Sequence, residues 1–96
     1  MIIEVLATML IGSVSNLEGR IGILVSTRGR IYNVHKVSPS ATMGLKTGDV
    51  VLSCDGIKGT KYIKGPVGSL AHLVIKRDDE EFKVDIVRVP EDAIDD

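Results

Sequence analysis

The regular alternation of hydrophobic and polar positions in the second half of the chain predicts a β-hairpin. Apolar residues occupy every second position of 70–77, at Ala71, Leu73 and Ile75. This spacing turns them all to one face of a strand. The same alternation returns over 82–89. The acidic run 78–81 between the two strands is typical of a solvated turn, so the chain is expected to fold back on itself there.

Shorter apolar runs predict the remaining strands. The segments 21–26 and 31–37 are rich in Ile and Val and are separated by a short polar connection. Another strand is expected over 50–54, and the Asp55-Gly56 pair that follows it is a turn signal. The next segment, 58–64, has room for one helical turn at most before Gly and Pro break the chain.

A short helix is predicted over 40–45. Pro39 fixes φ at a value that suits helix entry, and Ser38 or Ser40 can cap the first N–H groups. Beyond the helix, Gly48 is expected to take a positive φ, and Asp49 is expected to accept hydrogen bonds from turn amides.

The N-terminal segment is apolar with a helical period. Its large side chains fall on one helical face, at Ile3, Leu6, Leu10, Val14 and Leu17. A secretory signal or an anchor is the competing interpretation, but the segment lacks a preceding Lys or Arg, carries Glu4 and is too short to span a bilayer. We therefore expect an amphipathic helix over 2–17 that packs on the domain.

Composition limits the classes of function. The chain has 96 residues, of which 44% are hydrophobic and only three are aromatic, so one small domain with an aliphatic core is expected. A net charge of −1 gives no field for nucleic acid. The single cysteine, Cys54, excludes an internal disulfide and is expected to be buried, and no spacing of Cys, His or acidic residues indicates a metal site. His35 and His72 are expected to point outward from their strands.

These elements predict a mainly β fold with short helices, a small, partly open β-barrel or sandwich of about five strands. The expected organisation is an N-terminal helix and loop at 1–19, the domain at 20–90 and a frayed acidic tail at 91–96.

Two stretches resemble a known family. The centre of the chain reads Ser38-Pro39-Ser40-Ala41 and then Gly-Leu-Lys-Thr-Gly-Asp over 44–49, and the second half reads Ile-Lys-Gly-Pro-Val-Gly-Ser over 63–69. Both are similar to the permuted bacterial PDZ domain of the C-terminal processing (tail-specific) proteases. The resemblance covers about 21–89 and excludes the protease domain. It implies a PDZ-like fold and a protein-interaction module that captures a partner's C-terminal peptide by β-strand addition.

The resemblance also implies a site. The carboxylate-binding loop of PDZ domains has a Gly–apolar–Gly–apolar pattern, matched here by Arg20-Ile21-Gly22-Ile23. Its N–H groups would hold the carboxylate, and its two isoleucines would line an apolar pocket. Leu24 and Val25 would continue the edge strand, while Tyr62 and Ile63 would form the second wall. Arg20 replaces the first glycine and either assists the carboxylate or is simply solvated.

One departure from the family keeps a second interpretation open. The family's groove has a helix of about three turns as its second wall, whereas 57–64 is too short for it. The chain is then either a peptide-binding module or a structural, oligomerising domain that forms a homodimer through helix 2–17. In both cases we expect no enzyme activity, no cofactor and no membrane span. Length and the absence of a signal favour a small cytoplasmic protein of a bacterium or phage, although the family is mostly exported.

Overall fold

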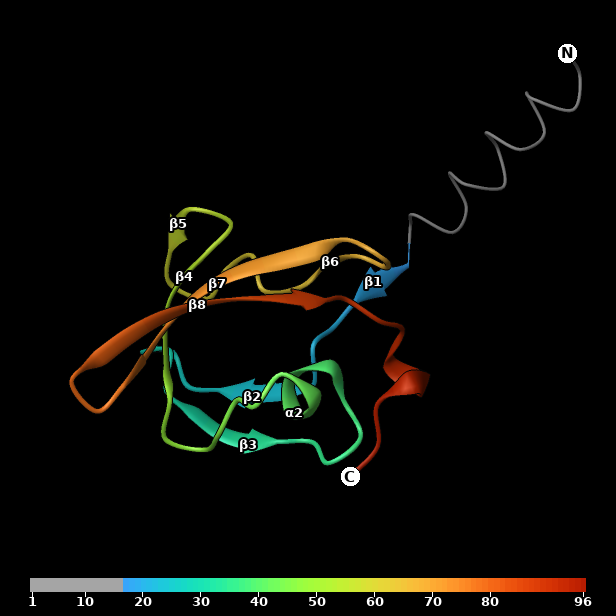
Figure 1. Ribbon diagram of the computed structural model, residues 1–96. Coiled ribbons are helices and arrows are strands. Elements are labelled where there is room, and N and C mark those ends of the chain that lie inside the picture. The colour runs from blue at the N-terminus through green and yellow to red at the C-terminus, as the bar shows by residue number, and fades with distance from the viewer. Residues whose placement is uncertain (1–16) are drawn as a thin grey trace, which may run out of the picture.

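The computed structural model describes residues 17–96, which form a mostly β structure (Figure 1). The elements in chain order are β1 (Glu18–Gly19), β2 (Ile23–Val25), β3 (Ile31–Val34), α2 (Pro39–Thr42), β4 (Val50–Cys54), β5 (Ile57–Lys58), β6 (Gly65–Pro66), β7 (Leu70–Arg77), β8 (Glu80–Val87) and the 3₁₀-helix η1 (Glu91–Ala93). The expected helix over 2–17 lies outside the described residues, apart from Leu17, which is in a bend.

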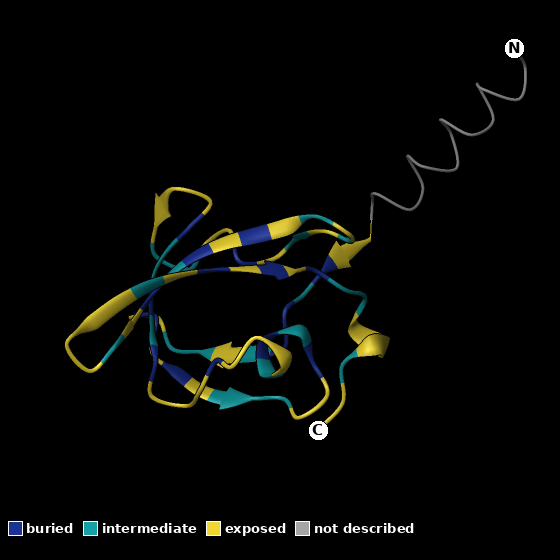
Figure 2. Cartoon of the chain, in the orientation of Figure 1, coloured by how far each residue is buried: buried dark blue, intermediate teal, exposed yellow. Residues whose placement is uncertain are grey.

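The largest sheet is antiparallel, with the strand order β5-β4-β7-β8. The β7–β8 hairpin has an unbroken register from Leu70 opposite Val87 to Arg77 opposite Glu80. Alternate residues of β7 are buried, as the sequence pattern predicts (Figure 2). Strand β8 begins two residues before the predicted start because the turn takes only 78–79, where Asp78 adopts a φ of 54°.

A second layer, formed by the β2–β3 pair and α2, lies opposite the β7–β8 hairpin (Figure 1). The aliphatic core contains residues from both layers: Ile21, Ile31, Leu45, Val51, Cys54, Ile63, Ala71, Leu73, Ile75, Val84 and Ile86. The expectation of an aliphatic core with a buried cysteine is confirmed. Together the two layers make a small β fold that is consistent with the PDZ-like architecture expected from the sequence.

The helix start follows its sequence signals. Pro39 is the first residue of α2, and Ala41 N donates to Ser38 Oγ at 3.1 Å, so Ser38 is the cap. Asp49 accepts from Lys46 N at 2.9 Å, as expected for a turn residue, and Gly48 has a φ of 99°. Asp49 is also held by Arg77 at 2.8 Å, so this loop is fastened to the end of β7.

Three predictions of local structure are wrong. Glu18–Gly19 form a strand with β6 instead of a loop, because a partner at Gly65–Pro66 completes the pairing. The segment 58–64 contains no helical turn; its first residue belongs to β5 and the rest consists of bends and turns. The tail 91–96 is not frayed: it begins with η1, and Asp95 pairs with Val37 through two backbone hydrogen bonds of 2.8 and 2.9 Å.

Candidate functional site

A pocket of about 550 Å³ lies beside the loop that the sequence singles out. One wall is 20–25, which includes β2, and the opposite wall is 60–64 without Tyr62. Residues Glu91, Ile94, Asp95 and Asp96 of the tail line a third side, with Tyr32 and His35 from the β3 region. Seven of the eight sequence-predicted site residues therefore share this pocket.

The loop has its shape because Gly22 packs against the cap of α2. Gly22 has a φ of 89°, and a Cβ at this position would lie 2.2 Å from the Ser38 Cβ atom. Only glycine satisfies both the conformation and the close approach. Ser40 N donates to Ile21 O at 3.0 Å, so α2 also holds the neighbouring residue. The loop 20–23 and the helix-start motif 38–41 thus form one structural unit.

At the centre of this loop, the carbonyl groups of Ile21 and Gly22 accept hydrogen bonds, whereas the N–H groups of the same two residues have no partner within 17–96. The carbonyl of Gly22 accepts from His35 N at 2.9 Å. No hydrogen bond within 17–96 has the N–H of Ile21 or Gly22 as its donor. The alternation of an antiparallel ladder next to the Gly22–His35 bond turns the N–H and C=O of Ile23 away from β3. Backbone donors of pocket-lining residues that are not used within 17–96 suit an anionic or strand-like ligand.

The apolar surface of the pocket comes from both walls. Ile21 and Ile63 are buried, with 1% and 7% of their surfaces exposed, and Ile23 is partly buried against the core. Leu24 and Val25 continue β2, whose only partner strand among the described residues is β3. The other edge of β2 is therefore open along the pocket.

The structure does not bring Tyr62 to this pocket. Its side chain is exposed and lines a shallower pocket that also contains Asp55, Pro66 and Arg88. The reason is local: without a helix, Tyr62 and Ile63 follow each other in an irregular segment and point to different sides. Ile63 alone supplies the large apolar side chain of this wall.

A buried arginine takes the place of the missing helix as the support of the second wall. The Arg88 side chain is 4% exposed. Its Nε atom donates to Ile63 O at 2.9 Å, and its terminal nitrogens donate to Tyr62 O at 2.8 Å and to Leu70 O at 2.9 Å. Sequence reasoning missed this residue, although its place two residues after Ile86 in the alternation of β8 puts it on the buried face.

Arg88 also constrains two residues around it, Asp55 and Gly65. It forms an ion pair with Asp55 at 2.8 Å, and a Cβ on Gly65 would lie 2.9 Å from the guanidinium. The N–H of His72 and the Arg88 guanidinium, both bound to the Asp55 carboxylate, lower the pKa of Asp55. Burial raises the pKa of the Cys54 thiol, so the neighbouring cysteine is held as a neutral, unreactive group.

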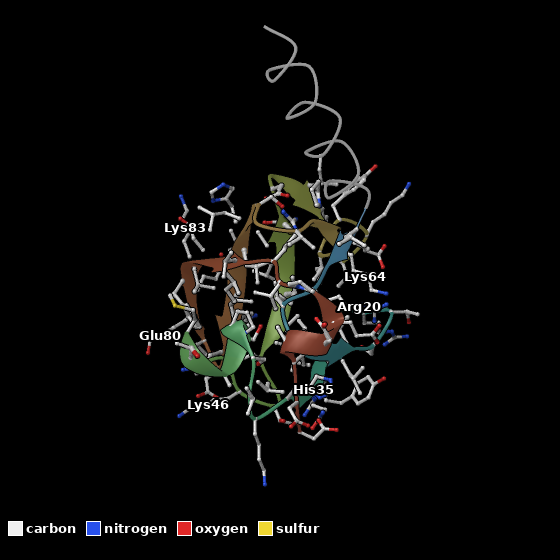
Figure 3. All side chains as sticks on the ribbon, turned by 90° about the vertical axis from the view of Figure 1, so that its right-hand side faces the viewer. Arg20, His35, Lys46, Lys64, Glu80 and Lys83 are labelled. Atoms are coloured by element: carbon white, nitrogen blue, oxygen red, sulfur yellow. The ribbon has the colours of Figure 1, made fainter. Side chains whose placement is uncertain are left out.

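Charged groups surround the end of the pocket that the loop 20–23 forms. Arg20 lies 3.6 Å from Glu18 and 3.8 Å from Glu91, and its side chain is 38% exposed. The His35 Nδ1 atom lies against the Asp96 carboxylate. Figure 3 shows Arg20, His35 and Lys64 on the same side of the molecule. Of the two interpretations of Arg20, simple solvation is incomplete, because acidic groups of the chain already contact it.

Metal-ligand clusters and membrane-spanning helices are both absent from residues 17–96. Within 17–96 no three His, Cys, Asp or Glu side chains gather closely enough to hold a metal ion. No helix of that part of the chain is long and apolar enough to cross a membrane.

Comparison with solved structures shows that this chain shares its fold with part of two proteases. No protein-family model and no curated protein matches this chain. Among solved structures, the photosystem II D1 C-terminal processing protease is similar with a TM-score of 0.66 and 16% identity, over 84% of this chain and 25% of that one. A serine endoprotease from Yersinia pestis is similar with a TM-score of 0.65 and 18% identity, over 86% of this chain and 36% of that one. The chain thus spans about a quarter to a third of two proteases and shares the fold of that part.

Proposed function

We propose that this chain is a PDZ-like, non-enzymatic module that binds the C-terminal peptide of a partner protein. The observation that carries the proposal is the pocket of about 550 Å³ between the open edge of β2 and 60–64, with loop N–H groups at one end that have no partner among residues 17–96. The resemblance of the sequence to the PDZ domain of C-terminal processing proteases supports it. So does the shared fold with a C-terminal processing protease.

The ligand would lie antiparallel to β2 as an added strand. Its main chain would bond with the outward N–H and C=O groups of Ile23 and Val25. Its terminal carboxylate would accept hydrogen bonds from the N–H groups of Ile21, Gly22 and Ile23, which are charge-assisted and stronger than bonds to a neutral amide. Arg20 would then exchange Glu91 for the ligand carboxylate.

One apolar side chain would supply most of the hydrophobic contact. Ile21, Ile23 and Ile63 form the surface for the ligand's last residue. Burial of one Leu or Val side chain contributes about 1.5–3 kcal/mol. A full helical wall would add contacts to further ligand residues, which the irregular segment 60–64 does not offer. We therefore expect weak binding that depends strongly on the terminal residue and its carboxylate.

The competing function is a structural domain that associates through helix 2–17. The expected helix lies outside the described residues, apart from Leu17. The two functions differ in a simple observable, since a structural domain has no preference for a free carboxylate.

Amide chemical shifts of the full chain, titrated with peptides that end in Val, Leu or Ile, test the proposal. Each peptide is used as the free acid and as the C-terminal amide. We expect shifts at 21–25 and at Ile63 with the free acids, and much smaller shifts with the amides. Ile23→Thr should weaken binding, whereas Tyr62→Thr, at an exposed residue outside the pocket, should leave it unchanged. Equal responses to acids and amides, or none, would refute the proposal.

A further inference from the structure

The segments that form the two main walls of the pocket carry positive charge without any negative charge. Neither 21–48 nor 56–77 contains an Asp or a Glu, although the whole chain has a net charge of −1. The acidic residues are concentrated elsewhere, above all in 78–81 and in the tail. Charge is therefore segregated along the molecule, and the pocket lies where the two kinds of segment meet.

The two basic segments come together at one edge of β4. Val51 N donates to Gly29 O at 2.8 Å, and Gly59 N donates to Leu52 O at 2.9 Å, so the β2–β3 turn and the segment after β5 follow each other along this edge. A Cβ on Gly29 would lie 3.6 Å from the Thr60 methyl group. Since Thr60 lines the pocket, this meeting point adjoins the pocket at the end where β2 finishes.

The backbone segments that meet here carry four cations, which we call the basic junction and of which Lys61 lines the pocket: Arg28, Arg30, Lys58 and Lys61. All four residues are exposed. Within the described chain, none of them has a carboxylate oxygen within 4.0 Å of its charged nitrogens. The Lys61 ammonium lies over the ring of Tyr62, 5.6 Å from its centroid. Several cations without a neighbouring anion raise the local electrostatic potential and attract acidic groups.

We propose that the basic junction binds acidic side chains of the same peptide whose C-terminus occupies the pocket. The partner is then a polypeptide with an apolar last residue preceded by an acidic run. This inference rests on the proposed function, because it requires a peptide that runs antiparallel to β2. Such a peptide has its end at Gly22 and passes Val25 before it reaches the junction. At a rise of 3.3 Å per residue, positions about four to eight before the end lie there.

The opposite end of the pocket fixes where the acidic run belongs. Glu91, Asp95 and Asp96 line the pocket near the carboxylate-binding loop. Their charges repel acidic side chains at the last positions of a ligand, and they also repel its terminal carboxylate, which Arg20 and the loop N–H groups have to offset. The pocket thus favours acidic residues far from the ligand's end and disfavours them next to it.

The test compares two peptides with the same apolar end. One carries a run of Glu upstream, and its twin carries Gln at each of those positions. Both are made as free acids and as amides, and their affinities for the full chain are measured by fluorescence anisotropy at low and high salt. We expect the Glu free acid to bind about tenfold more tightly than the Gln free acid at low salt, with the difference shrinking as salt screens exposed charges.

Charge-reversed variants locate the effect. Arg28→Glu combined with Lys61→Glu should abolish the preference for the Glu peptide. Lys83→Glu is the matched control, because Lys83 is exposed on β8 and lies on the other side of the molecule from Arg20 and Lys64 (Figure 3). Circular dichroism verifies that each variant is folded, and the comparison of the two peptides on the unmodified protein does not depend on the variants.

The outcomes distinguish the acidic-run inference from the proposed peptide-binding function on which it rests. Equal affinities of the Glu and Gln free acids, with amides still weaker, would overturn the acidic-run inference and leave peptide capture intact. A preference that survives reversal of Arg28 and Lys61 would also overturn it. Equal binding of acids and amides would instead refute the proposed function itself.

Discussion

Replacement of Arg88 by Met should destabilise the protein by about 3 kcal/mol. Arg88 is 4% exposed, and Met retains much of its alkyl stem. The substitution removes the hydrogen bonds to three backbone carbonyls, those of Tyr62, Ile63 and Leu70. Loss of one member of a buried ion pair typically costs about 3–5 kcal/mol. The lower end applies here because the Asp55 side chain is 35% exposed, so water can hydrate the carboxylate that is left behind.

Urea unfolding followed by far-UV circular dichroism measures this change. The matched control is Arg28→Met, at an exposed arginine with no ion pair among residues 17–96, which should shift the free energy of unfolding by no more than about 0.5 kcal/mol. Arg88→Lys should fall between the two, because a lysine keeps the charge but cannot reproduce the planar fork of donors.

The location of the damage is a second readout. If Arg88 supports the second wall, amide hydrogen exchange in the Arg88→Met protein should accelerate at 62–65 more than in the β7–β8 hairpin. A loss of stability below about 1 kcal/mol, or one spread evenly over the molecule, would refute the argument that this arginine replaces the wall helix.

Three further predictions concern single residues. Gly22→Ala should lower the free energy of unfolding in urea by about 2–4 kcal/mol, because it adds a close contact to the strain of a positive φ. Gly44→Ala is the control: Gly44 has a φ of 83° and open space around its Cβ, so the cost should be only about 1 kcal/mol. Similar losses would contradict the role of the close contact. The hydrogen bonds from Arg77 are the main reason why the pKa of the Asp49 carboxyl is lowered, so this group stabilises the fold above its unfolded pKa of about 3.9. Urea midpoints should therefore fall as the pH drops from that value through the lower folded pKa, and Asp49→Asn should flatten this dependence. Cys54 is fully buried with a raised pKa, so iodoacetamide should modify it slowly in the native protein and rapidly in urea; rapid native modification would show that the core opens there.

The sequence predicted well those features that depend on neighbouring residues. The β7 strand occupies its predicted range of 70–77, because strict alternation over eight residues admits only one face for the core. Ser38 caps α2 and Pro39 begins it, one residue before the predicted start, since capping and a fixed φ act within one helical turn; the helix ends at Thr42, short of the predicted 45. The loop residues Arg20 to Val25 line one pocket, although that prediction relied on a family resemblance and not on periodicity.

Features that depend on residues far apart in the sequence were missed. The tail 91–96 reads as a frayed acidic end, yet Asp95 pairs with Val37 and Asp96 with His35. Tyr62 reads as a wall residue, yet an irregular backbone turns it away from the pocket. For the tail, the local pattern is neutral and distant partners decide the conformation, whereas at Tyr62 the lack of a helix decides it.

Local signals were sufficient to predict the hairpin, the start of the short helix, the turns and the aliphatic character of the core, because periodicity, capping and allowed φ values act over a few residues. The closure of the pocket depends instead on contacts between segments that are distant in the chain. Arg88 supports Ile63 from 25 positions away, and the tail reaches a loop some seventy positions before it. Such contacts form only after the layers have packed, since a buried guanidinium is stable only where several carbonyls already converge on it.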